Sequence, residues 1–151
     1  MPDTNQHIRA QVRGAIAAAL VPISETGGRV FQARAWPLEP DDLPCWLIHV
    51  DGERIETKQT GRLARQTRTV AVNVVLLCKH SDSVEDEMDD ISAQAEELLL
   101  SDPAICALTR EFTLDATESA LNADGSIVVG QTRLAFSATV TTVAGAPRDR
   151  A

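Results

Sequence analysis

The spacing of apolar residues predicts two amphipathic helices. Between about Asn5 and Val21, apolar side chains recur at the i, i+4, i+7 and i+8 spacing of one helix face, and Pro22 ends the segment. A second helix is expected from Val84 to Leu100, after the potential capping residues at 81–83. Its apolar stripe is predicted to contain Val84, Met88, Ile91, Ala95, Leu98 and Leu99. Its opposite half carries the carboxylates Glu85, Asp86, Asp89, Asp90, Glu96 and Glu97.

Alternation of apolar and polar residues, together with turn signals, predicts a set of strands. The expected strands are Arg29–Ala35, Cys45–Val50, Thr69–Lys79, Phe112–Thr117 and Ile127–Val143. Thr69–Lys79 is apolar on both sides for much of its length, which indicates a central strand covered on both faces. Asp51-Gly52 and Asn122–Gly125 are expected to form turns, and Gly130 is interpreted as a bulge.

The remaining segments are predicted to be connections. Trp36–Pro44 holds three prolines and is expected to be a loop, whereas Ala104–Leu108 adds a short helical turn. Glu53–Arg68 is a polar arm, either a loop or a long hairpin that begins and ends in strand. We expect one α+β domain over residues 1–143 and a flexible tail over 144–151. The order α-β-β-β-α-β-β indicates a mostly antiparallel sheet with its two main helices on one side.

Composition and charge narrow the possible functions. The chain has 151 residues and a net charge of −8. Residues 1–79 hold ten Lys/Arg against eight Asp/Glu, and residues 80–151 hold four against fourteen. Because DNA affinity comes largely from phosphate neutralisation, so acidic a chain is not expected to bind nucleic acid sequence-specifically. There is no Tyr, and the chain has two Trp and three Phe, which also disfavours base stacking on aromatic rings.

The residues that usually carry chemistry do not form a recognisable catalytic or metal motif. Cys45, Cys78 and Cys106 are widely spaced, which favours reduced thiols in a cytoplasm. Cys78 and His80 share a strand face, but a zinc site needs three or four converging ligands. We therefore expect no catalytic residues, no metal and no cofactor. No apolar run has membrane-spanning length, so no membrane association is expected.

Two charged segments remain as candidates for interaction. The carboxylates of the second helix are expected to form a solvated face, which suits a charged lumen or a partner surface better than a catalytic pair. The polar arm carries Arg54, Lys58, Arg62, Arg65 and Arg68. It is either an ordinary exposed loop or a subunit interface that pairs with the acidic helix of a neighbouring copy.

The element order and several segments resemble the tail terminator (tail completion) proteins of long-tailed bacteriophages and prophages, the lambda minor tail protein U group. The similarity covers nearly the whole chain. It is carried by Ile8–Leu20, Leu43–Val50, the polar arm, Arg68–Leu76, the acidic helix with Met88–Ile91, and Leu134–Val140.

This resemblance implies a structural protein rather than an enzyme. It implies a homo-hexameric ring on the tail tube, which stops tube growth and offers a surface for joining the head, with the tube and head–tail connector proteins as partners. The expected location is the host cytoplasm during assembly and then the virion tail. Two alternatives are a neck or connector completion protein and a monomeric adaptor. A metal-dependent hydrolase would require at least two of Asp86, Asp89 and Asp90 to converge in a cleft.

Overall fold

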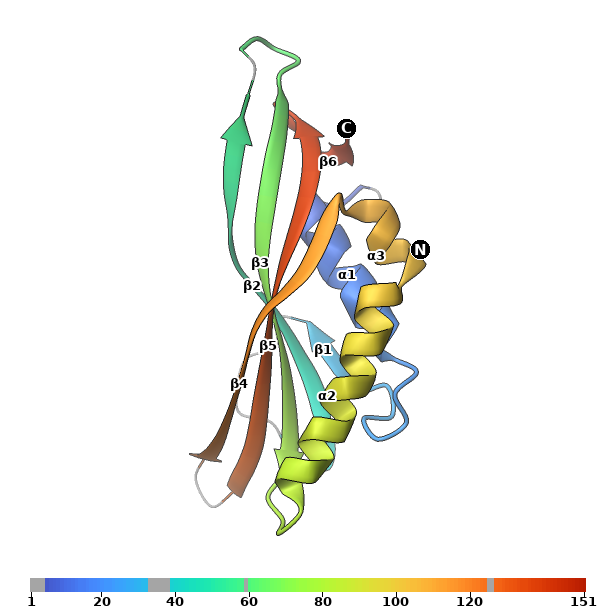
Figure 1. Ribbon diagram of the computed structural model, residues 1–151, viewed down its shortest axis with the longest axis vertical. Coiled ribbons are helices and arrows are strands. Elements are labelled where there is room, and N and C mark those ends of the chain that lie inside the picture. The colour runs from blue at the N-terminus through green and yellow to red at the C-terminus, as the bar shows by residue number, and fades with distance from the viewer. Residues whose placement is uncertain (1–4, 33–38, 59, 125–126) are drawn as a thin grey trace.

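The computed structural model describes residues 5–32, 39–58, 60–124 and 127–151. In this part of the chain, a curled and mostly antiparallel sheet carries its helices on one side (Figure 1). The helices are α1 (Ile8–Leu20), α2 (Val84–Ser101) and α3 (Pro103–Leu108), with a 3-10 turn at Pro40–Asp42. The strands are β1 (Val30–Gln32), β2 (Cys45–Thr57), β3 (Arg65–Lys79), β4 (Glu111–Asp124), β5 (Ile127–Val143) and β6 (Ala146–Arg150). The predicted α+β class is confirmed.

The sheet has the order β1-β2-β3-β5-β4, and β6 pairs with β5. Among the described pairings, β1 with β2 is parallel and the others are antiparallel. The core lies between the helices and the covered face of the sheet, where Trp46 and Phe136 are its largest fully buried side chains. Phe112 stacks on Phe136 with ring centroids 4.8 Å apart, so β4 is held to the core by an aromatic contact as well as by its hydrogen bonds.

Both long helices form where the apolar spacing predicts them. The buried side chains of α2 are Val84, Met88, Ile91, Ser92, Ala95 and Leu99, whereas Leu98 is only half-buried. Ser83, one of the potential capping residues, is the N-cap of α2, but its side chain makes no capping hydrogen bond. At α1 the N-cap is His7, whose Nδ1 accepts a hydrogen bond from the backbone of Arg9 at 3.1 Å.

The central position of β3 agrees with its apolar pattern. Val70, Val72, Val74, Leu76 and Cys78 are buried beneath the helices. On the open face, which is the face opposite the helices, Val75 and Leu77 are buried in a second cluster with Leu43, Cys45, Leu47 and Val129. Ala71 and Lys79 on that face are exposed. The second face is therefore covered over only part of the strand.

Several boundaries differ from the predicted ones. The predicted tight turn at Asp51-Gly52 is wrong, because β2 continues through a bulge at Asp51 and ends at Thr57. Since β3 begins at Arg65, the Glu53–Arg68 connection is the long hairpin, one of the two forms expected for it. Sequence alone favoured a turn because Asp-Gly is the strongest short hairpin signal.

Two bulges, each at an aspartate, bend strands on either side of the sheet centre. Asp51 in β2 and Asp115 in β4 are left out of the strand register. The carboxylate of Asp51 accepts a hydrogen bond from Asn73, and that of Asp115 accepts one from Ser137. A bulge adds one residue to a strand and increases its twist, so the two sites contribute to the curl of the sheet.

Gly130 is not a bulge, which corrects its interpretation from the sequence. It pairs in regular register with Cys78 on one side and Leu121 on the other. A Cβ at this position would lie 2.8 Å from Val84 Cγ2 and 2.9 Å from Met88 Sδ. The glycine is therefore required because α2 packs directly against β5 at this point.

The C-terminal segment forms a strand instead of the predicted flexible tail. Gly145, with φ +81°, turns the chain so that β6 pairs back onto β5. Gln11 of α1 donates a hydrogen bond to the Arg148 backbone carbonyl at 2.8 Å, which ties β6 to the first helix. The end of the first predicted strand, part of the proline loop (33–38) and Gly125 of the predicted Asn122–Gly125 turn lie outside the described residues.

Candidate functional site: two charged ends of the molecule

The arm, residues 53–68, extends past the helices at one end of the long axis (Figure 1). It consists of the last residues of β2, the first residues of β3 and a tip at 58–64. The N-terminal end of α2 and the last residues of β4 lie at the opposite end (Figure 1). The arm and the N-terminal end of α2 thus lie at opposite ends of the molecule, whereas the C-terminal end of α2 lies near its middle (Figure 1).

A buried ion pair fixes the base of the arm. Glu53 Oε1 lies 2.9 Å from an Arg68 guanidinium nitrogen and 3.3 Å from that of Arg9 on α1. The Arg68 Nε donates to Thr142 Oγ1 at 2.9 Å, so β2, β3, β5 and α1 meet at one network. The Glu53 and Arg68 side chains are 9% and 8% exposed. Nearby, burial and the positive charge of Arg9 lower the pKa of His7.

This network corrects the expectation that Arg68 belongs to a subunit interface. Its guanidinium is occupied within the chain by Glu53, Thr142 and Gln66. It therefore positions the arm and is not exposed to a partner. Arg54 is exposed and forms an ion pair with Glu56 at 3.0 Å, which leaves that part of the arm nearly neutral.

The outer part of the arm is cationic. Lys58, Arg62 and Arg65 are exposed, and no ion pair involves them within the described residues. Arg110, which the sequence analysis did not single out, lies beside the arm. Together with Lys58, Arg65, Thr67 and Thr141, it lines a hollow of about 200 Å³.

An exposed leucine stands at the arm tip. The Leu63 side chain is 82% exposed, the highest value among the large apolar residues found exposed in the described part of the chain. Its neighbour Ala64 is buried, donates to the Gly61 carbonyl at 3.3 Å and accepts from the Ala144 backbone at 2.8 Å. These contacts hold residues 61–64 in a turn from which Leu63 is exposed to solvent.

The acidic face of α2 runs from the other end of the molecule to its middle (Figure 1). The helix contains seven carboxylates and no basic residue. Six are exposed and Glu96 is half-buried, so the predicted placement on a solvated face is confirmed. Glu87 belongs to the same surface, although the sequence analysis did not name it. Within the described part of the chain, none of the seven takes part in an ion pair.

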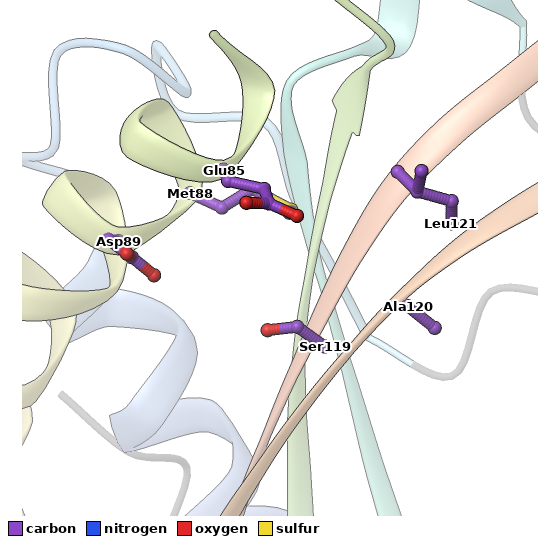
Figure 2. Close-up of a pocket in the computed structure, with 6 residues that line it drawn as sticks. All are labelled: Glu85, Met88, Asp89, Ser119, Ala120 and Leu121. Atoms are coloured by element: carbon purple, nitrogen blue, oxygen red, sulfur yellow. The ribbon is translucent and has the colours of Figure 1, made fainter.

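A groove separates the start of α2 from the end of β4. It has a volume of about 430 Å³ and is lined by Glu85, Met88, Asp89, Ser119, Ala120 and Leu121. Figure 2 shows Glu85 and Met88 reaching from the helix toward the strands, with Ser119 pointing back toward the helix. Leu121 is 54% exposed at the groove. The groove therefore combines an apolar surface with two carboxylates, one helical turn apart, at its rim.

The edge strand β4 is a third surface that could pair with another chain. It lies at one end of the sheet order, so its outer edge has no strand partner among the described residues. However, the bulge at Asp115 interrupts the edge, and the charged Glu111 and Glu118 are exposed along it. Bulges and charges are the usual means by which edge strands avoid pairing with another chain. The arm and the groove are stronger candidates.

The possible chemical sites are dispersed. Cys45 and Cys78 are buried and Cys106 is exposed. Burial, together with the negative charge of Glu87, raises the pKa of the Cys78 thiol to about 12. Among the described residues, no group of three or more His, Cys, Asp or Glu side chains is placed to hold a metal ion. No described helix is both long and apolar enough to cross a membrane.

Comparison with known proteins leaves the function to be argued from the chain itself. A scan against protein-family models and a search of curated proteins gave no match.

Proposed function

We propose that this protein is a structural subunit that assembles with copies of itself, and that the assembly is the ring that caps the tail tube of a long-tailed bacteriophage. The two charged ends of the molecule support the general class, a subunit that assembles with copies of itself. Its specific role comes from the resemblance of the sequence to tail terminator proteins. The ring ends tube polymerisation and offers a surface to the head–tail connector.

The separation of charge along the molecule is the observation that carries the proposal. A cationic arm and the N-terminal part of an acidic helix lie at opposite ends of one chain (Figure 1). Neither surface can neutralise the other within the same chain, but each can do so between neighbouring chains. Contacts of this head-to-tail kind form a closed ring when the rotation between subunits closes, and a filament when it does not.

In this role the protein is not an enzyme and uses no cofactor. Six copies form the ring, and the tail tube protein and the connector are its partners. The chain is made in the host cytoplasm and becomes part of the virion tail. Neither nucleic-acid recognition nor a membrane enters this function.

The direct test is to express the protein together with a tail tube protein from the same genome and to image the products by electron microscopy. We expect tubes of defined length, each ending in a six-fold ring of this protein. Native mass spectrometry of the isolated protein at increasing concentration gives the subunit number. A protein that stays monomeric at high concentration and also with tube protein present would exclude the proposal.

A further inference from the structure

From the shapes and charges of the two ends, we propose that the arm tip of one copy inserts Leu63 into the groove between α2 and β4 of the next copy. This inference rests on the proposed self-assembly and specifies the contact by which it occurs. The contacting groups are an apolar side chain between cations on one chain, and an apolar groove with carboxylates at its rim on the other.

The two surfaces match in polarity. Leu63 is 82% exposed and lies between Arg62 and Ala64-Arg65, so an apolar group is flanked by positive charge. In the groove, Met88 and Leu121 supply apolar surface, whereas Glu85 and Asp89 supply negative charge. A volume of about 430 Å³ is large enough for a leucine and for part of an arginine stem beside it.

The occupant that fits this groove is a second copy of the chain, because each copy presents the complementary tip at its other end. The arm tip and the groove lie at opposite ends of the long axis, so a chain cannot fill its own groove (Figure 1). The network of Glu53, Arg68 and Thr142 fixes the arm base, and the Ala64–Ala144 hydrogen bond fixes the tip, so the arm cannot fold back. Every copy nevertheless carries both an arm tip and a groove.

The contact is expected to carry much of the association. Leu63 is unfavourably exposed in the isolated chain and becomes desolvated in the groove, which is the setting in which single side chains dominate an interface. The charges around it contribute chiefly to orientation and to the rate of association. They also predict that association weakens at high salt, because rim charges remain accessible to ions.

The first experiment compares Leu63→Ser with Leu100→Ser, a matched change at a leucine that is 47% exposed near the other end of α2. Sedimentation velocity over a range of concentrations gives the association constant. We expect Leu63→Ser to weaken association by at least about tenfold and Leu100→Ser to leave it nearly unchanged. Far-UV circular dichroism of both variants checks that each is folded.

The second experiment uses the head-to-tail geometry. A variant with a disabled tip (Leu63→Ser with Arg62→Gln) retains its groove, and a variant with a disabled groove (Glu85→Lys with Asp89→Lys) retains its tip. Each alone is expected to be largely monomeric. When mixed, they can form only one productive junction, so the expected product is a one-to-one heterodimer and not a ring.

The outcomes separate this contact from the broader proposal. If the wild-type chain assembles and both disabled variants assemble equally well, the Leu63 contact is wrong while the ring proposal stands. If the wild-type chain remains monomeric at all concentrations and with tube protein, both are wrong. Loss of assembly in each variant with heterodimer formation on mixing supports the contact.

Discussion

The buried ion pair at the base of the arm makes a quantitative prediction about stability. Replacing Glu53 by leucine leaves the Arg68 guanidinium, whose side chain is 8% exposed, without its carboxylate partner. Loss of one member of a buried pair costs about 3–5 kcal/mol. We expect the lower end, about 3 kcal/mol, because Thr142 and Gln66 still accept hydrogen bonds from Arg68. For a chain of this size, the loss lowers Tm by about 6–12 °C.

The assay is urea unfolding, followed by circular dichroism at a concentration where mass measurement shows a single species. The variants are Glu53→Leu, Arg68→Met and the double variant. The double variant removes both charges, so its loss of stability should fall short of the sum of the single losses by at least about 2 kcal/mol. Arg54→Gln breaks the exposed pair with Glu56 on the same strand and should change stability by less than about 1 kcal/mol.

Two results would refute this reasoning. If Glu53→Leu lowers the free energy of unfolding by no more than Arg54→Gln does, the buried pair stabilises the fold no more than the exposed pair. If the losses from Glu53→Leu and Arg68→Met simply add, the two side chains do not stabilise one another. In either case the arm would lack the fixed base from which its contact with a second copy is argued.

Three further predictions test other parts of the fold. Gly130→Ala should cost about 1–3 kcal/mol in unfolding free energy, because its methyl group would collide with α2. The matched change Gly14→Ala, in a helix with no atom near the new group, should stabilise by about 0.5–1 kcal/mol. Because the folded-state pKa of His7 is lowered, the unfolded chain binds the proton more readily, and stability should fall as pH drops through about 6.5. His7→Asn, which retains a capping acceptor, should reduce this loss in thermal unfolding between pH 7.5 and 5.5, and an unchanged slope would contradict the assignment. In thiol titration, Cys106 should react rapidly while Cys78, with its pKa raised to about 12, should react only on unfolding, and rapid labelling of both would contradict its burial.

The elements that follow from local periodicity were predictable from the sequence. The helix beginning at Val84 has a clean apolar stripe, and Ile127–Val143 alternates along its whole length, so both have bounds close to or equal to the expected ones. The ends of β2 and β3 were less predictable because both faces of the arm are polar. Beyond the helices the arm packs on no core, so its apolar and polar residues are not constrained to alternate.

The misplaced features depend on contacts between distant parts of the chain. Gly130 resembles a bulge in sequence, and only the approach of α2 shows why a side chain is excluded there. Arg68 looked like an exposed cation because its partners, Glu53 and Thr142, come from two other strands. Leu63 is the single leucine in a polar arm, but single apolar residues are common on protein surfaces, so the sequence alone did not distinguish it.

The bulge at Asp51 determines which side chains of the arm face the helices. Before it, odd-numbered residues of β2 such as His49 face the open side of the sheet, whereas beyond it odd-numbered residues such as Glu53 face the helices. If Asp51 were instead paired in regular register, with no bulge, every side chain of β2 beyond that point would be inverted. Glu53 would then turn into solvent, and Arg54 would be directed toward the buried Arg68. The bulge thus decides whether the base of the arm holds an ion pair or two like charges.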